Sequence, residues 1–575
     1  MDISNSVIAG SSGISDGEAI YSDQGKLSLL SSTITKNRRG LKLVGTEHSV
    51  ANPILNQKAQ GDLDGAQQSN VSTNIIGDGT FAGTNGNLQS DPRFTDAVSG
   101  DYSLRRGSPA IDTASPDYSS GLVDALSLER VVDGDDDGQP RADIGALEYQ
   151  STHGVPVILP VLSSRTDEFV GIAMVNTSAE TAHVELSGYS VGGALQATYK
   201  KEVAARAQFS ILLTEALPGL KQGWIQIISN KPDLMTFSLV GTNSLNELDG
   251  ADLTGAISTK VVLPEIIRQG SSDTELFIVN PNAEPVKVDV RLHTPTQERS
   301  LTTATIPARG LYSRLISAFG GTSISGYLTL EVVEKKPIFA MEMLLRSGST
   351  AGLLGLDATR PQPALFGAQV ASTASVDTLL NVINLGSTAA DLTLEAFNES
   401  GTLLKSVTVA KLAAGQQYRK SASEIFGLST DLVGWARVSA KDGKLLGCLT
   451  FSDTAGNFMA SLPLQSQPAR EFVLGHVAQT ADVFTGVTLL NAGTGYAEVS
   501  VEVLDRSGAS KGISLFELKP NEKRAKLLSE YVPGLAQQEG GFVRVRSSSP
   551  IFGFELFGHY LLRFMSAVPQ QVVVY

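Results

Sequence analysis

The 575-residue sequence predicts an all-β protein, and three observations lead to that prediction. A set of sequence marks recurs four times in residues 155–575. Apolar and polar residues alternate along many of its segments, as they do in β-strands. A shorter repeat of about 20 residues, rich in Asn, Ser, Gly and aliphatic side chains, occupies residues 1–90. Together they predict coils of a parallel β-helix followed by four tandem β-sandwiches in an elongated arrangement.

The long repeat is defined by three marks that keep one order. The first mark is an asparagine after an apolar run, with copies spaced by 104, 104 and 107 residues: Asn176, Asn280, Asn384 and Asn491. The second mark is a glycine followed by an aromatic ring: Gly223-Trp224, Gly326-Tyr327, Gly434-Trp435 and Gly541-Phe542. The third mark is an apolar string: residues 234–237, 337–340, 445–448 and 550–553. These marks predict tandem domains at residues 155–258, 260–361, 362–466 and 467–575.

Each repeat is expected to form two packed sheets. Between residues 286 and 292, and again between 499 and 503, aliphatic residues alternate with polar ones, which buries one face of a strand. About seven short strands in ~105 residues fit a sandwich. We expect the repeated asparagine to end a strand and bond nearby backbone. We expect the repeated aromatic ring to fill the space between the two sheets.

A single helical turn is expected near residues 213–217, 315–319, 423–426 and 529–532, because Gly or Pro-Gly follows each segment. The repeated pattern resembles the immunoglobulin-like modules of many bacterial extracellular proteins. That resemblance implies an architecture and no chemistry. The short linkers between the repeats predict a semi-rigid rod of modules ~35–40 Å long.

The short repeat predicts stacked coils in residues 1–90, within a first domain of residues 1–150. Ile34 and Ile54 are 20 residues apart, Ile54 and Ile75 are 21 apart, and Val7 precedes Ile34 by 27. Each coil would bury its inward aliphatic layer only against its neighbours.

Four strings follow in order: Ser90-Asp91-Pro92-Arg93-Phe94, Asp101-Tyr102-Ser103-Leu104, Gly107-Ser108-Pro109-Ala110-Ile111-Asp112 and Asp143-Ile144-Gly145-Ala146-Leu147-Glu148-Tyr149. They resemble the C-terminal end of bacterial secreted right-handed β-helix proteins of the choice-of-anchor Q type. The resemblance implies a last coil and cap near Tyr149, export to the cell surface or medium, and a chain that begins inside the helix. We therefore expect a processed N-terminus or a covered first coil. Head-to-tail pairing of that coil edge would build a filament.

Charge and one acidic loop indicate a cation site. Residues 1–150 hold 11 Lys+Arg and 21 Asp+Glu, and so carry −10 of the net charge of −14. An acidic chain argues against nucleic acid as a partner. Asp133, Asp135 and Asp137, with Gly138, match the first half of a Ca²⁺ loop, and Asp143 or Glu148 could supply the missing carboxylate. We expect a structural Ca²⁺ at Asp133, Asp135, Asp137 and Asp143; the alternative is a hydrated acidic loop.

Catalytic patterns are weak. The six histidines show no paired metal spacing, and the single cysteine, Cys448, lies in an apolar run typical of a core residue. A polysaccharide-cleaving groove on the coils could use Asp16 and Asp23 with Lys36, Arg38 and Arg39. The few coils in residues 1–90 argue against a long substrate groove, so no catalytic residue is assigned.

The sequence therefore predicts a non-enzymatic, extracellular or cell-surface bacterial protein with a structural or adhesive role, such as a stalk, surface-layer component or filament subunit. No apolar run approaches the ~18 residues that cross a membrane. Two alternatives stay open. One is a polysaccharide lyase or glycoside hydrolase whose sandwiches are accessory modules. The other is a carbohydrate-binding module array for surface glycans.

Overall fold

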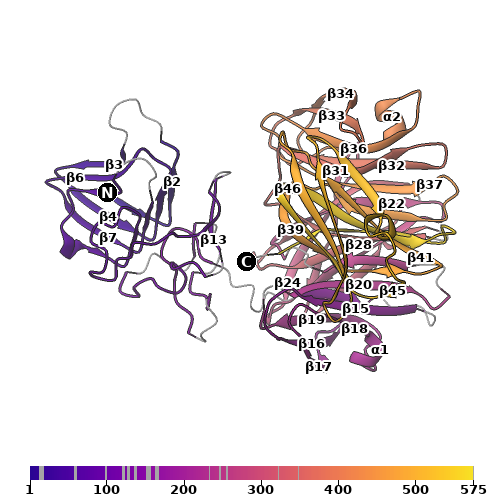
Figure 1. The fold of residues 1–575 in the computed structure, drawn as a ribbon, viewed down its shortest axis with the longest axis horizontal. Coiled ribbons are helices and arrows are strands. Elements are labelled where there is room, and N and C mark those ends of the chain that lie inside the picture. The colour runs from indigo at the N-terminus through magenta and orange to yellow at the C-terminus, as the bar shows by residue number, and fades with distance from the viewer. Residues whose placement is uncertain are drawn as a thin grey trace. The chain divides into compact units, whose positions relative to one another are not determined.

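The chain forms two compact units, residues 1–155 with 574–575, and residues 156–573. The computed structural model describes residues 1–11, 18–56, 61–97, 100–105, 107–118, 123–125, 130–134, 139–149, 157–161, 168–231, 234–244, 248–253, 257–321, 323–346 and 349–573. Nearly all elements are strands, so the predicted all-β class is confirmed (Figure 1). No helix among the described residues has the length and apolar character needed to cross a membrane.

Unit 1 is built from three ladders of parallel strands. The first joins β1 (Asp2–Ser4), β4 (Lys26–Leu30), β7 (Glu47–Ala51) and β10 (Val71–Ser72). The second joins β2 (Val7–Ala9), β5 (Thr33–Thr35), β8 (Ile54–Asn56) and β11 (Ile75–Ile76). The third joins β3 (Glu18–Asp23), β6 (Arg39–Val44) and β9 (Leu63–Asp64). Each turn of the chain therefore adds one strand to each ladder.

The register of these ladders explains the short repeat. Ile54 pairs with Ile75, 21 residues on, whereas Ile8 pairs with Ile34, 26 residues on. The longer first interval contains the insertion that the sequence shows before Ile34. Inward side chains such as Leu27 and Leu29 are fully buried between the ladders. The aliphatic layer of each turn thus packs on the next, as the sequence predicts.

The rest of unit 1 covers the second ladder. A hairpin joins β12 (Phe94–Asp96) to β13 (Asp101–Leu104). The 3-10 turn η1 (Gln68–Asn70) instead contacts β7 and β10 of the first ladder. Ile111, Ile144 and Tyr149 form a second core with Ile54 and Ile75 of that ladder. The segment that ends at Tyr149 therefore packs on a sheet face.

Unit 2 is a fourfold repeat of one arrangement, in which each repeat has two sheets and the strand order of each sheet is the same from repeat to repeat. We call these repeats 1 to 4. Repeat 1 has β14 (Val157–Val161), β19 (Gly223–Ser229), β16 (Ala182–Ser190) and β17 (Leu195–Val203) in one sheet, and β18 (Gln208–Leu212), β15 (Glu168–Asn176), β20 (Leu234–Thr242) and β21 (Leu248–Asp252) in the other. Repeat 2 has β22 (Lys260–Gln269), β27 (Ser323–Val332), β24 (Val286–His293) and β25 (Glu298–Ile306), with β30 (Leu356–Asp357), and then β26 (Leu311–Leu315), β23 (Asp273–Val279), β28 (Phe339–Arg346) and β29 (Ser349–Leu354).

Repeats 3 and 4 keep this order, with links between their two sheets. Repeat 3 has β31 (Ala364–Ser372), β36 (Leu432–Ser439), β33 (Ala390–Asn398) and β34 (Leu403–Leu412), and then β35 (Gln417–Ser421), β32 (Val376–Asn384), β37 (Leu445–Asp453) and β38 (Met459–Pro463). Repeat 4 has β39 (Ala469–Leu474), β46 (Phe542–His559), β42 (Ala497–Leu504) and β43 (Ser510–Leu518), with β48 (Gln571–Val572), and then β44 (Lys523–Leu527), β41 (Val483–Leu490), β46 again and β47 (Met565–Pro569). A small pair, β40 (Ala478–Gln479) with β45 (Gln538–Glu539), completes it.

The local predictions for the repeats are confirmed. Helical turns occur at α1 (Leu213–Ala216), η2 (Ile316–Phe319), α2 (Ala422–Phe426) and α3 (Leu528–Tyr531). The side chains of Val286, Val288 and Val290 are fully buried, whereas Lys287 between them is exposed and Asp289 is half-buried. Each repeat thus has an apolar core between its two sheets.

The four repeated asparagines end a strand or directly follow one, and they share one set of contacts. Asn280 is fully buried, and its Nδ2 donates to the carbonyl oxygens of Glu284, Ile306 and Pro307 while its Oδ1 accepts from the amide of Asn282. Asn176, Asn384 and Asn491 make the equivalent bonds. Each asparagine therefore fastens two loops of its own repeat.

Two predictions about the repeats are wrong. The repeated aromatic ring does not fill the space between the sheets of its own repeat, because Trp224 packs on Phe277, Val279 and Leu311 of repeat 2. Nor do the repeats extend as a rod. Gln208 in repeat 1 donates hydrogen bonds to carbonyls 267 and 333 residues away in repeat 4. Burying large rings between repeats, with their polar groups paired, favours the closed arrangement.

The second sheets of the four repeats meet at the centre of unit 2. Strand β21 contacts β29 and β47, and β38 contacts β29 and β47. Each repeat therefore touches the next, and repeat 4 touches repeat 1. In Figure 1 the purple strands β15 and β20 and the yellow strand β46 belong to the same body.

Candidate functional site

The expected Ca²⁺ residues fall in different surroundings. Asp135 and Asp137 lie outside the described residues. Asp133 is half-buried, and Asp143 is fully buried. Across the described part of the chain, no three carboxylate, histidine or cysteine side chains are grouped to hold a metal ion. The Ca²⁺ loop therefore stays a prediction.

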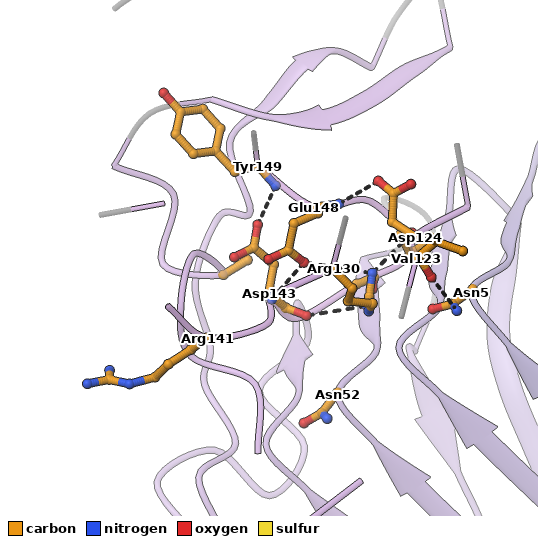
Figure 2. A network of polar contacts seen from close by, with 12 residues as sticks. Asn5, Asn52, Val123, Asp124, Arg130, Arg141, Asp143, Glu148 and Tyr149 are labelled. Atoms are coloured by element: carbon orange, nitrogen blue, oxygen red, sulfur yellow. Dashed lines mark hydrogen bonds and ion pairs between the residues drawn. The ribbon is translucent and has the colours of Figure 1, made fainter. Parts of the chain in front are cut away.

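Asp143 holds backbone amides (Figure 2). Its Oδ1 accepts from the amide of Asp112 at 2.8 Å, and its Oδ2 accepts from the amide of Tyr149 at 2.5 Å. Its own amide donates to Glu148 Oε2 at 3.0 Å. Both carboxylate oxygens of Asp143 are thus engaged in tying residues 112 and 149 together.

The guanidinium of Arg130 is buried against residues 143–148. Nη2 donates to the carbonyl oxygen of Gly145 at 2.5 Å, and Nη1 lies 3.9 Å from Glu148 Oε2. The amide of Glu148 in turn donates to Asp124 Oδ2 at 3.0 Å. Figure 2 shows Arg130 close to Asp143 and Glu148, which belong to one segment of the chain.

This polar cluster changes the acidity of its members. Burial raises the pKa of Asp143, although the amides of Tyr149 and Asp112 oppose that rise. Burial raises the pKa of Glu148 as well, and the negative charge of Asp143 adds to the effect. Burial lowers the pKa of Arg130, and the neighbouring carboxylates oppose that shift. The two carboxyl groups therefore hold protons at a higher pH than exposed ones would.

The cluster fastens the segment around Gly145 to the ladders. The amide of Gly145 donates to the carbonyl oxygen of Asn52 at 2.8 Å, and that of Ala146 donates to Thr33 Oγ1 at 3.0 Å. Gly145 has a φ of 112°, and a Cβ there would lie 2.7 Å from Ile54 Cδ1, so only glycine fits. These contacts give the cluster a structural role, which the sequence signals only as the string 143–149.

The coil residues considered for polysaccharide cleavage do not converge. Register places Arg39 opposite Glu18, at the far end of β3 from the exposed Asp23. Lys36 is half-buried in the turn after β5, Arg38 is exposed, and Asp16 lies outside the described residues.

The most organised sites are the contacts between repeats, which we call joints. At joint 1–2, Trp224 Nε1 donates to the carbonyl oxygen of Arg309 at 2.7 Å. At joint 2–3, Tyr327 Oη donates to the carbonyl oxygen of Gly415 at 2.6 Å. At joint 3–4, Trp435 Nε1 donates to that of Asn521 at 2.9 Å. Each accepting residue has a positive φ, which turns its carbonyl toward the preceding repeat.

Joint 4–1 connects the last repeat to the first. The ring of Phe542 has no polar atom to donate a hydrogen bond, and the side chain of Gln208 makes the hydrogen bonds there. Gln208 Nε2 donates to the carbonyl oxygens of Gly475 and Gly541 at 2.8 Å each, and its Oε1 accepts from the amide of Gly541 at 2.6 Å. The amide of Gln208 also donates to the carbonyl oxygen of Arg506 at 2.9 Å. Four hydrogen bonds thus converge on one buried residue of repeat 1.

Joint 2–3 also buries a charged group. Glu265 accepts from Arg419 Nη2 at 3.1 Å, from Asn381 Nδ2 at 3.1 Å and from Thr450 Oγ1 at 2.5 Å. Its amide donates to Glu342 Oε1 at 2.9 Å. Burial raises the pKa of Glu342 well above its usual value, and the nearby Glu265 adds to that rise.

Comparisons with known proteins give little further information. No family model matches the sequence, and no curated protein matches it. Among solved structures, the chain is similar to the one titled "Crystal Structure of Thermotoga maritima 1070", over 19% of this chain and 98% of that one. The sequence identity is 10% and the TM-score is 0.17. Values this low support no inference about fold or activity.

Proposed function

We propose that this chain is a non-enzymatic extracellular protein with a structural or adhesive role. The proposal takes unit 1 as the end of a parallel β-helix and the four repeats as immunoglobulin-like sandwiches, joined in a closed set in place of a rod. The observation that carries it is joint 4–1, where Gln208 fastens the last repeat to the first. Buried polar groups that hydrogen-bond one repeat to another hold the outer surfaces of the repeats in fixed positions.

The outer strands of unit 2 supply such surfaces. Strands β17, β25, β34 and β43 each form the edge of a sheet and are largely exposed. Three of them carry outward apolar side chains, with Leu195 57%, Leu403 47% and Leu515 73% exposed. Fixed copies of one kind of edge favour multivalent attachment, which raises overall affinity without new contacts.

Self-association is part of the proposal. An edge strand presents unpaired backbone donors and acceptors, and these pair readily with the edge of another copy. A head-to-tail contact of that kind repeats without closing and builds a filament.

Two assays on the full chain test the proposal. The first incubates the chain with a panel of polysaccharides and measures new reducing ends and unsaturated uronates. The second measures attachment of chain-coated beads to bacterial cells and to a glycan array under flow, together with assembly by light scattering. We expect attachment or assembly without turnover. Turnover that is lost in Asp23→Asn but kept in Asp101→Asn would overturn the proposal in favour of the enzyme alternative, and so would chain that neither attaches nor assembles.

A further inference from the structure

Joint 4–1 contains an open cavity of about 480 Å³. Five phenylalanine rings line it, Phe169 and Phe237 from repeat 1 and Phe484, Phe557 and Phe564 from repeat 4. His476 of repeat 4 also lines it. The volume lies within the ~300–1,000 Å³ of small-molecule pockets, which are mostly apolar with a few polar groups. Phe237 and Phe557 are almost completely buried, so the rings form the wall of a recess and not a surface patch.

The cavity exists because small residues replace large ones at this joint. In repeat 3, Asn381 pairs with Arg419 across β32 and β35, and both side chains bond Glu265 of repeat 2. The same register in repeat 1 pairs Ala173 with Ser210. The space that a planar guanidinium and an amide occupy at joint 2–3 is therefore left open at joint 4–1.

His476 takes the place of Glu265. The amide of His476 donates to Glu555 Oε2 at 3.3 Å, as the amide of Glu265 donates to Glu342. The imidazole stacks on Phe237 with ring centroids 5.4 Å apart and meets Phe557 edge-on at 4.6 Å. Within the described part of the chain, neither ring nitrogen has a hydrogen-bond partner.

The chemistry of the wall defines the ligand. Burial lowers the pKa of His476 to about 4, so its imidazole is neutral at physiological pH and offers one donor and one acceptor. Aromatic walls favour a flat apolar body, because rings stack with an offset or edge to face. The charged residues that line the cavity, Glu215, Glu539 and Arg506, are two acids and one base, so no strong single charge selects an ion.

We propose that the cavity at joint 4–1 binds a small, uncharged aromatic molecule that makes one hydrogen bond to the imidazole of His476. The ligand fills the place that Arg419 and Asn381 fill at joint 2–3. This inference is independent of the structural or adhesive function, because it concerns the interior of a joint and not the outer edges.

Indole and its analogue indene, which lacks the N–H group, are suitable probes. Titration of the full chain, followed by ligand-observed NMR and calorimetry, is expected to show saturable binding of both, with indole tighter. His476→Phe keeps an aromatic wall but removes the hydrogen bond, and it should weaken indole about tenfold, the equivalent of about 1.4 kcal/mol, with little effect on indene.

A matched pair of variants tests the location. Ser210→Arg places the long side chain of repeat 3 in the cavity and should abolish binding of both probes. Ser313→Arg makes the same change at the equivalent register in repeat 2, where Ser313 is exposed, and should leave binding unchanged. Melting curves for each variant show whether it is folded. The proposal is wrong if wild-type chain shows no saturable binding of indole up to millimolar concentration, or if folded Ser210→Arg still binds it.

Discussion

Gln208 is the residue at which the closed arrangement of the repeats can be tested by stability. We expect Gln208→Leu to weaken joint 4–1 selectively, because leucine is the natural residue at the equivalent position of repeat 2, Leu311. Leucine therefore fits the local strand geometry. It cannot replace the three side-chain hydrogen bonds to Gly475 and Gly541.

The magnitude follows from the groups left unpaired. Two carbonyls and one amide in the joint lose their partner, and an unpaired buried polar group costs about 1–3 kcal/mol. The leucine side chain recovers about 1–2 kcal/mol through apolar burial. The three groups together cost about 3–9 kcal/mol, so the expected loss in the free energy of unfolding of unit 2 is about 1–8 kcal/mol.

Tryptophan fluorescence during urea unfolding is the assay. Both tryptophans of the chain, Trp224 and Trp435, lie in unit 2, so the signal reports this unit alone. Gln196→Leu is the matched control, because Gln196 is exposed on β17 and bonds only the carbonyl of Ala194. If Gln208→Leu and Gln196→Leu unfold within about 0.5 kcal/mol of each other, which is the size of ordinary surface effects, Gln208 does not hold the joint.

Three further predictions concern other parts of the chain. Asn280→Ala should destabilise repeat 2 by at least about 4 kcal/mol, because three carbonyls and one amide lose a buried partner at about 1–3 kcal/mol each. The exposed Asn457→Ala is the control in the same urea assay, and equal midpoints for the two variants would contradict the prediction. Burial raises the pKa of Asp249 from 3.8 to about 6, so the folded state holds a proton that the unfolded state releases. Its contribution to stability is therefore complete below pH 3.8 and is lost as the pH rises through 6. The stability of wild type relative to Asp249→Asn should fall by about 2–3 kcal/mol between pH 4 and pH 7, and a difference that does not change with pH would refute this. Calorimetry with Ca²⁺ should show binding that Asp133→Asn with Asp135→Asn removes; no heat at millimolar Ca²⁺ would leave the hydrated loop as the correct interpretation.

Much of the fold within each repeat could be predicted from the sequence. Alternation at residues 286–292 and the recurring asparagines report local geometry, because each depends on neighbours in the same repeat. Asn280 makes its contacts with residues no more than 27 positions away, so the repeat of the asparagine along the sequence is enough to predict its local role.

The arrangement of the repeats could not be predicted in the same way. A buried ring such as Trp224 gives the same apolar signal whether it packs between two sheets or between two repeats. Joint 4–1 depends on Gln208, whose counterparts at the same register are Leu311, Gln417 and Lys523, so no single residue type marks the joint in the sequence. The contacts among Asp143, Glu148 and Arg130 could not be predicted from the sequence either, because they depend on the burial of these side chains and not on their spacing.

The closed arrangement itself is tested most directly by a distance between repeats 1 and 4. Spin labels on Ala204→Cys and Ser507→Cys, both exposed sites, would flank the hydrogen bond between Gln208 and Arg506. The native Cys448 is fully buried and burial raises the pKa of its thiol, so it should not react with the label. Pulsed electron resonance should then give one narrow distance of roughly 20–30 Å, allowing for the label arms and the few residues between. A broad distribution near ~100 Å, as expected for three ~35 Å modules in a row, would contradict the account.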